Sequence, residues 1–396
     1  MNGIRKIAEA WLILGITVAL LLFLELIGFL AAKIHRPYDL RANLPVYKDF
    51  DQREEFWREH EKTWYKNQQY IPYHLWNRKP FSGKWHNVDA NGVRATHYNA
   101  DEKKDGVKKI FMLGGSILWG TGAADWETIP SYVAKFLNKN NPQYVVYNYG
   151  ETGYVASQEL NRLISEIKKQ NIPNIVIFYD GVNDAFAGAY ALFALKTPSY
   201  HAHMDQFEKM FKGNRSTHFF EILKTTYIFQ AIDLARGKLL PHPEERWEKK
   251  IKDAEMQEAV QRTVKYLISN YKIASAIGKE YGFRVIFCLQ PNIYLGKKVL
   301  QEYEKEFLKT RLRAVDLVYA EIKRIIKENT SSGIYDLSDV FETVTEPIYI
   351  DWTHTGPLGN YHVAKKIGEI IKSESEEMEI MSEIMMITKT KKEGYL

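Results

Sequence analysis

Short apolar runs alternate with amphipathic segments along residues 107–372. Buried strands are predicted at residues 110–113, 144–147, 175–179, 284–289 and 334–337. Helical spacing of apolar positions predicts helices over residues 126–140, 155–169, 254–281, 299–328 and 358–372. Strands that alternate with helices favour a parallel sheet covered on both faces, since right-handed crossovers return each strand to the same sheet. We therefore predict an α/β fold with a three-layer, doubly wound, flavodoxin-like sheet of five parallel strands.

The predicted domain, residues 107–372, is interrupted by residues 186–253, which we interpret as a helical insertion. Its apolar segments 219–223 and 227–229 fit a lid or an acyl-binding wall, but helices that pack onto the domain are the plainer interpretation. No period of 20–50 residues recurs, which excludes a solenoid. The mixed acidic and Met-rich residues 373–396 are predicted to fray or to form a peripheral helix.

Residues 33–106 are polar and aromatic, with charge runs such as residues 51–60. They predict a short helix followed by turn-rich chain, in which Asn91-Gly92 is a strong turn signal. The segment contains four tryptophans, which a flexible stalk would not carry: Trp57, Trp64, Trp76 and Trp85. We therefore predict an extension that packs against the main domain.

An apolar stretch near the N-terminus, residues 11–32, has Glu25 as its only charged residue. As a helix it would measure about 33 Å, enough for a hydrocarbon layer of roughly 30 Å. The apolar part of a cleaved signal peptide is shorter, about 7–15 residues, and Leu30-Ala31-Ala32 is a poor cleavage site. We predict an uncleaved transmembrane signal-anchor rather than a signal peptide or a buried core helix. Glu25 is interpreted as leaning toward the lipid headgroups rather than as an intramembrane contact.

The positive charges beside this stretch leave its orientation undecided. Arg5 and Lys6 precede it, and Lys33, Arg36 and Arg41 follow it. We predict a single-pass membrane protein in which residues 1–10 form a cytoplasmic stub. The bulk of the chain would then lie outside the cytoplasm.

Charge and cysteine content exclude several classes of protein. The net charge of +5 is spread over 396 residues, so a nucleic-acid partner is not expected. The single cysteine, Cys288, excludes an internal disulfide framework and a thiolate zinc cluster. His201-x-His203 lacks further ligands, so we predict neither a metal site nor a cofactor. The oligomeric state is left open.

Polar residues follow the predicted strands where reactive groups gather in an open parallel sheet, beyond the carboxyl ends. Four segments qualify: residues 114–122, 148–153, 180–184 and 351–360. The first has the glycine spacing of a phosphate loop, but Thr121-Gly122 replaces the required Lys-Ser/Thr. What remains there is Ser116 among glycines.

The spacing Asp351-x-x-His354 allows a carboxylate to accept a hydrogen bond from an imidazole in a tight turn. The imidazole could then take the proton of Ser116, and the acid would stabilise the imidazolium. Acyl transfer also needs donors for the developing oxyanion. The Ser116 amide, a glycine amide after the second strand and the Asn183 side chain would converge at the same sheet edge.

These four segments resemble the sequence blocks of the SGNH/GDSL hydrolases over residues 107–372. The resemblance implies Ser116 as nucleophile, His354 as base and Asp351 as its partner. It also implies an oxyanion hole made of the Ser116 amide, the Gly153 amide and the Asn183 carboxamide, with Gly150 as the alternative glycine. Gly115 departs from the Gly-Asp-Ser pattern, and Asp184 is expected to brace its loop.

We therefore predict a membrane-anchored serine esterase or acylhydrolase that removes O-acetyl or other short acyl groups from a small molecule, or from a cell-envelope glycan or lipid. One alternative is an O-acyltransferase that uses the same triad on cell-envelope polysaccharide. A second is a non-catalytic envelope module that binds glycan or a partner, against which the complete set of reactive residues argues. Flanking Trp119 and Trp352 would line the pocket or serve packing.

Overall fold

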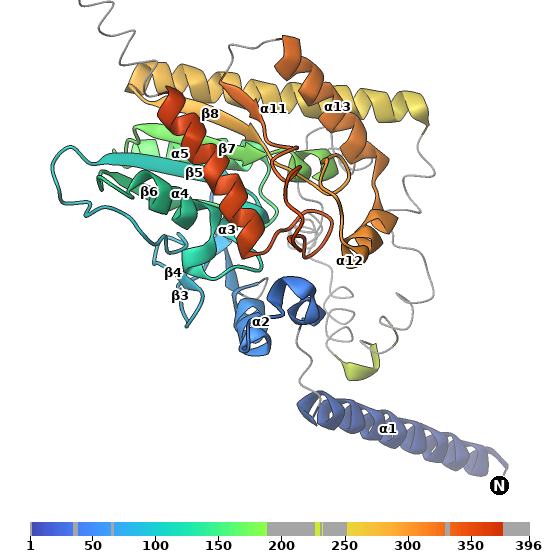
Figure 1. The fold of residues 1–396 in the computed structure, drawn as a ribbon. Coiled ribbons are helices and arrows are strands. Elements are labelled where there is room, and N and C mark those ends of the chain that lie inside the picture. Colours follow the sequence, from blue (N-terminus) through green and yellow to red (C-terminus); the bar gives the residue numbers. More distant parts are fainter. Residues whose placement is uncertain are drawn as a thin grey trace, which may run out of the picture. The chain divides into compact units, whose positions relative to one another are not determined.

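The computed structural model describes residues 2–34, 39–64, 67–187, 226–229, 232, 252–328 and 333–374. These residues fall into two compact units (Figure 1). The larger unit contains the described residues from Leu40 to 187 and from Lys252 to 374. The smaller unit contains residues 2–34 and 39 together with 226–229 and 232.

A five-stranded parallel sheet forms the centre of the larger unit. Its strands are β5 (Lys108–Gly114), β6 (Tyr144–Asn148), β7 (Ile175–Asp180), β8 (Arg284–Leu289) and β9 (Ile334–Asp336). Their order across the sheet is β6-β5-β7-β8-β9, and every neighbouring pair is parallel. The chain therefore runs from the centre to one edge and then back across the sheet to the other, as in a doubly wound fold. The predicted fold class and all five predicted strands are confirmed.

Helices cover the sheet on both faces, as Figure 1 shows. They are α4 (Ile129–Leu137), α5 (Ala156–Lys168), α11 (Asp253–Tyr281), α13 (Arg313–Glu328) and a helix over residues 357–374. Local signals set their ends: the Thr128 side chain accepts from the Ser131 amide at the start of α4, and left-handed Gly282 ends α11. Helix α11 packs against α5, α13 and β8, while Phe136 of α4 contacts Tyr361 of the last helix.

The helix predicted over residues 299–328 is wrong in its first half. The structure has the short helix α12 (Glu302–Lys305), a 3-10 turn over Glu306–Thr310, and then α13. Glu304 is fully buried, where its carboxylate accepts from Lys298 Nζ at 2.8 Å and from two backbone amides of the chain before Asp351. A continuous helix would form only its own backbone hydrogen bonds. The observed break instead gives the buried Glu304 carboxylate its partners and supplies an acceptor to two backbone amides of a neighbouring loop.

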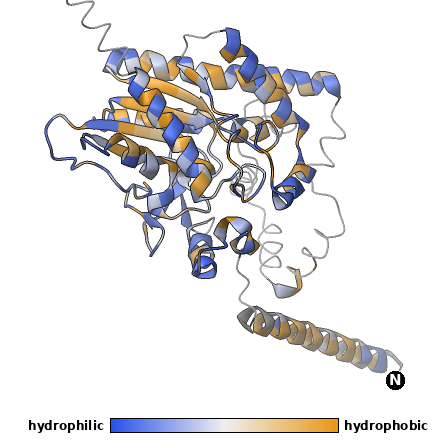
Figure 2. Ribbon diagram, viewed as in Figure 1, coloured by the Kyte–Doolittle hydropathy of each residue, from blue (hydrophilic) through white to orange (hydrophobic). Residues whose placement is uncertain are grey.

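The strands are apolar because both of their faces are covered. Every residue of β7 is buried, and Ile110 to Gly114 of β5 are buried as well. Figure 2 shows the strands of the sheet as predominantly hydrophobic and the exposed sides of the helices as hydrophilic. This pattern explains why short apolar runs, rather than alternating ones, mark these strands.

The extension is part of the larger unit from Leu40 onward. It comprises 3-10 turns at Leu40–Asn43 and Pro45–Tyr47, helix α2 (Arg53–Thr63), and the hairpins β1–β2 (Gln68–Ile71, Leu75–Arg78) and β3–β4 (Phe81–Ser82, Asn87–Val88). Arg94 forms an antiparallel β-bridge with Asn148 of β6, so the extension continues the central sheet beyond this edge strand. Trp57, Trp76 and Trp85 are buried.

The smaller unit is built on helix α1 (Asn2–Ile34), which at 1.5 Å per residue is about 50 Å long. Residues Gly3–Leu30 reach a mean hydropathy of 2.6 and are long and apolar enough to cross a membrane. The hydrophobic side chains of α1 are exposed along its length.

Glu25 does not merely lean outward, contrary to the interpretation from sequence. Its carboxylate accepts from the backbone amides of Tyr227 at 2.7 Å and Ile228 at 3.2 Å. Gly28 makes room for this contact, because a Cβ there would lie 2.5 Å from Cβ of Tyr227. Residues 226–229 of the predicted insertion thus pack on α1, and Glu25 provides the acceptor for two of their backbone amides.

Several predictions concern residues outside the described part of the chain. They are the pair His201 and His203, the apolar segment 219–223, most of the insertion 186–253, and the tail beyond residue 374.

Candidate active site

Ser116 lies at the carboxyl end of the central strand β5. The strand ends at Gly114, and Ser116 begins the one-turn helix α3 (Ser116–Trp119). Gly120 ends this helix in the left-handed region with φ of 101°, a conformation that favours glycine. Ser116 is 7% exposed, which leaves its hydroxyl reachable while the backbone of the turn is buried.

Gly115 is required by a close approach. A Cβ on this residue would lie 2.3 Å from Nδ2 of Asn183. The side-chain amide of Asn183 therefore occupies the space that an aspartate would fill in the Gly-Asp-Ser pattern. The departure at residue 115 brings this amide directly beside the residue that precedes Ser116.

Asp351 and His354 share a tight turn after the buried run Ile348 to Ile350. One carboxylate oxygen of Asp351, Oδ1, accepts from the backbone amides of Thr353 at 3.0 Å and His354 at 2.7 Å. The turn closes by a hydrogen bond from the Ile350 amide to the His354 carbonyl at 2.9 Å. The spacing of two intervening residues thus folds the carboxylate back onto the imidazole.

The three side chains form one hydrogen-bonded line across 238 residues of sequence separation. The distance from Ser116 Oγ to His354 Nε2 is 2.7 Å. On the other side of the ring, His354 Nδ1 lies 2.8 Å from Asp351 Oδ2 and 3.0 Å from Oδ1. Both distances are within hydrogen-bond reach, so the geometry suits a proton relay.

The charge state of Asp351 decides how the imidazole is oriented. Burial works to raise the pKa of Asp351, but the charge of His354, hydrogen bonds from that residue and the charge of Arg41 hold this pKa well below its usual range. An ionised carboxylate can only accept, so Nδ1 of His354 must carry the proton. In the neutral imidazole Nε2 is then the acceptor, and the Ser116 hydroxyl donates to it.

The Gly153 amide, one of the proposed oxyanion donors, can be compared with that of the alternative glycine, Gly150. The Gly150 amide already donates to Asn148 Oδ1 at 3.0 Å, and a Cβ on Gly150 would lie 2.4 Å from the Trp119 nitrogen. Gly153 has φ of 76°, and its amide donates to no acceptor among the described residues. Gly150 therefore serves close packing, which leaves Gly153 as the better donor for a substrate oxygen.

Within the described part of the chain, Asn183 Nδ2 has one hydrogen bond, to the Tyr154 carbonyl at 2.8 Å. A carboxamide nitrogen has two hydrogens, so one N–H stays available beside Gly115. The bond to Tyr154, which follows Gly153 directly, ties the helical residues 182–187, which include Asn183, to the loop of Gly153.

Asp184 is buried and contacts backbone rather than the serine. Its carboxylate accepts from the Ala156 amide at 3.3 Å. Burial and the charge of Asp180 raise its pKa well above the usual range, and burial also raises the pKa of Asp180, to about 7. Glu159 completes a cluster of three buried carboxyls, with its pKa raised mainly by burial. The contact fits a bracing role for Asp184.

Both flanking tryptophans take part in packing. Trp119 is fully buried, and its ring lies 4.2 Å from the guanidinium carbon of Arg94 and 4.6 Å from that of Arg78. Trp352 stacks on Tyr294 with ring centroids 5.2 Å apart. Trp119 therefore does not line a pocket.

Sequence reasoning missed three arginines of the extension that contact the loops around Ser116, Gly153 and Asp351. Arg94 and Arg78 are fully buried, and each forms a buried ion pair, with Asp125 and Glu151 respectively. Removing one partner of such a pair typically costs about 3–5 kcal/mol. The clustering of tryptophans in this segment was the only signal, since aromatic rings are common neighbours of buried arginine.

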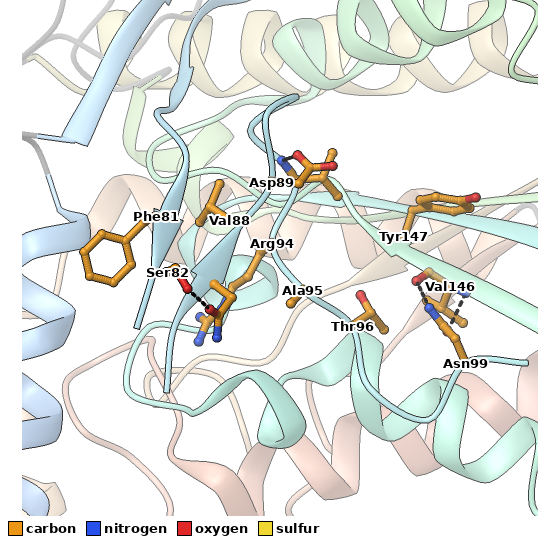
Figure 3. A pocket seen from close by; sticks show the side chains of 12 residues that line it. Phe81, Ser82, Val88, Asp89, Arg94, Ala95, Thr96, Asn99, Val146 and Tyr147 are labelled. Atoms are coloured by element: carbon orange, nitrogen blue, oxygen red, sulfur yellow. Dashed lines mark hydrogen bonds between the residues drawn. The ribbon is translucent and has the colours of Figure 1, made fainter. Parts of the chain in front are cut away.

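A hollow of about 390 Å³ lies beside the edge strand β6 (Figure 3). Arg94 lines it, but none of the proposed catalytic or oxyanion-hole residues does. Asn99, which Figure 3 labels, pairs with the backbone of Val146 through both its amide nitrogen and its oxygen. This contact covers the outer edge of β6. Among the described residues, no group of three or more His, Cys, Asp or Glu side chains is placed to hold a metal ion.

Comparison with known proteins identifies the relatives of this chain. A family model described as GDSL-like Lipase/Acylhydrolase matches residues 110–367. No curated protein matches the sequence.

Solved structures with a similar fold share little sequence with the chain. A member of the lipolytic protein G-D-S-L family from Veillonella parvula is 13% identical, with 67% of this chain and 98% of that chain covered and a TM-score of 0.35. The acetyl xylan esterase AlAXEase is 15% identical, with 65% and 97% covered and a TM-score of 0.35. A GDSL-like lipase from Bacteroides thetaiotaomicron is 13% identical, with 68% and 89% covered and a TM-score of 0.32.

Proposed function

The chain belongs to the family of GDSL-like lipases and acylhydrolases, hydrolases that act on ester bonds, and we propose that it is a membrane-anchored serine esterase whose nucleophile is Ser116. The observation that supports this proposal most directly is the line of hydrogen bonds from Ser116 through His354 to Asp351. A serine hydroxyl is a weak nucleophile until a base removes its proton.

In the first half-reaction Ser116 Oγ attacks the ester carbonyl while His354 Nε2 takes the hydroxyl proton. Asp351 stabilises the imidazolium that forms. The carbonyl oxygen becomes an oxyanion, held by the Ser116 and Gly153 amides and the Asn183 carboxamide. Collapse of the tetrahedral intermediate breaks the ester bond, and His354 returns the proton to the leaving alcohol.

In the second half-reaction a water molecule attacks the acyl-enzyme. His354 takes a proton from this water, and the same three donors hold the second oxyanion. Collapse of the second tetrahedral intermediate breaks the bond between the acyl carbon and Ser116 Oγ, and His354 returns its proton to that oxygen. The products are a carboxylic acid and free Ser116. An acyltransferase would use a sugar hydroxyl in place of water, with every other role unchanged.

We assign the substrate to O-acetyl or other short acyl esters on a cell-envelope glycan or lipid. Helix α1 supports the envelope location, because it is long and apolar enough to anchor the chain in a membrane. In this proposal residues 1–10 stay in the cytoplasm, and the unit that contains Ser116 lies outside it.

The test is covalent labelling of the full-length protein in membranes with a fluorophosphonate probe, together with hydrolysis of p-nitrophenyl acetate. Ser116→Ala should abolish both signals. Ser275→Ala, a half-buried serine of α11, is the matched control and should keep both. Labelling that survives in the Ser116 variant would contradict the proposal. Adding a sugar acceptor and analysing the products separates hydrolysis from acyl transfer.

A further inference from the structure

The extension before the central sheet places an arginine against three of the four segments that bear the proposed catalytic groups, namely those of Ser116, Gly153 and Asp351. Arg94 contacts the loop of Ser116. Its guanidinium donates to the carbonyls of Trp119 and Gly120, both at 2.8 Å, and to that of Ala123 at 2.7 Å. Three carbonyls that point at one buried cation hold the turn after Ser116 in a single conformation.

Arg78 contacts the loop that leads to Gly153. Its Nε donates to Glu151 at 2.9 Å, and a second nitrogen donates to the Thr152 hydroxyl. From the same strand, β2, the indole nitrogen of Trp76 donates to the Thr152 carbonyl at 3.0 Å. The position of the Gly153 amide therefore depends on side chains of the extension.

Arg41 contacts the acid of the proposed triad itself. Its Nη1 donates to Asp351 Oδ2 at 3.4 Å, the same oxygen that lies 2.8 Å from His354 Nδ1. The guanidinium also stacks over Trp57 of α2, 4.4 Å from the ring centroid. The Arg41 side chain is 26% exposed, unlike the two fully buried arginines.

A cation that shares a carboxylate with the imidazole has two consequences. The cation restrains the orientation of the carboxylate toward the imidazole. Its positive charge also offsets part of the negative charge of the carboxylate that would stabilise the imidazolium. His354 and Arg41 are the charged groups that act on Asp351. Both therefore hold the pKa of Asp351 below its usual range, and the Arg41 cation shares the carboxylate with the imidazole.

We propose that Arg41 is a positioning residue that sets the charge balance of the Asp351–His354 pair, so that the extension is a working part of the active site. This inference rests on the proposed function of Ser116, His354 and Asp351. It assigns a role to the extension, which lies before residues 110–367 that the family model matches. The chemistry of the triad alone does not require such a role.

The test compares the pH profiles of kcat/KM for the full-length enzyme and for Arg41→Gln, with p-nitrophenyl acetate as substrate. Without the cation, Asp351 faces the imidazole with its full charge, which favours the protonated state of the coupled Asp351–His354 pair. The acidic limb of the profile should move up by about 0.5 unit. The plateau of kcat should fall severalfold while KM changes little. Arg41→Lys keeps the positive charge, so the acidic limb of its profile should lie close to that of the unmodified enzyme.

Arg53→Gln is the matched control, because Arg53 belongs to the same extension and donates to the Lys48 carbonyl rather than to a carboxylate. Its profile should follow that of the unmodified enzyme. Melting curves of all three variants check that each one folds. An unmoved limb in Arg41→Gln, or an equal movement in Arg53→Gln, would overturn the inference. Activity that survives in Ser116→Ala would instead overturn the proposed function, so the two failures are distinguishable.

Discussion

Asn183 illustrates how a single side chain serves two loops at once. Its amide nitrogen donates to the Tyr154 carbonyl at 2.8 Å, and it fills the space that the missing side chain of Gly115 leaves. One N–H of the carboxamide then faces the region beside Ser116. At the scale of residues, the absence of a Cβ at position 115 and the presence of an amide at position 183 are two parts of one arrangement.

Replacing Asn183 by Ala should lower kcat about 10²–10³-fold while KM changes little, since one oxyanion donor contributes roughly 2.7–4 kcal/mol to the transition state. Steady-state kinetics on p-nitrophenyl acetate would measure this loss. Asn161→Ala is a suitable control, because the Asn161 side chain donates to the Tyr73 carbonyl on the exposed side of α5. An unaltered kcat in the Asn183 variant would exclude this residue from the oxyanion hole.

At the scale of elements, the apolar stretch of helix α1, residues 11–32, carries one carboxylate, Glu25, which already accepts hydrogen bonds. Glu25 accepts from two backbone amides of residues 227 and 228, which otherwise would need water. Backbone amides without partners cost free energy in a hydrocarbon layer. The need of these two amides for an acceptor is therefore a physical reason for a charged residue in this apolar stretch. The sequence shows the charge but not the segment that it serves.

The proposed topology of α1 can be tested with cysteines, because the single native cysteine, Cys288, is fully buried. A membrane-impermeant maleimide applied to spheroplasts should label Lys103→Cys, an exposed position in the larger unit. Lys6→Cys, exposed before the apolar stretch, should label only after lysis. The reverse pattern would place the larger unit in the cytoplasm and contradict the proposed orientation.

At the scale of the whole molecule, three buried carboxyls lie on α5, on β7 and on the helical residues 182–187. Asp180 and its neighbours Glu159 and Asp184 also lie near Tyr271 and Cys288, whose pKa values burial raises as well. A carboxyl whose pKa is raised on folding stabilises the fold while it is protonated. For Asp180, this contribution is complete below its usual pKa of 3.8 and is lost as the pH rises toward about 7.

Asp180→Asn removes the ionisation and should therefore stabilise the protein more at pH 8 than at pH 5, by on the order of 2 kcal/mol. That gain corresponds to a melting temperature about 4–8 °C higher at pH 8. Thermal unfolding at the two pH values measures it. Asp105→Asn, at an exposed position, should leave the difference between the two pH values unchanged. A gain of equal size at both values would show that Asp180 does not titrate in this range.

Prediction from sequence succeeded where the signal is local. The five strands are short apolar runs, and the turn from Asp351 to His354 spans four residues, so nearby side chains already encode both. It failed for residues 299–312, which form a short helix and a 3-10 turn instead of one continuous helix, since the burial of Glu304 against Lys298 depends on contacts that no local pattern reveals. The catalytic roles of Ser116, His354 and Asp351 stay predictions until they are measured.

The sequence by itself determined the α/β class and the apolar helix α1, and it predicted which side chains are reactive, because hydrophobic periodicity and residue chemistry are properties of short segments. Only the tertiary structure decided that Ser116 and His354 lie 2.7 Å apart, that Arg41 reaches Asp351, and that Glu25 meets the backbone of Tyr227. Such contacts join residues between about two hundred and about three hundred positions apart, and chain folding alone brings them together.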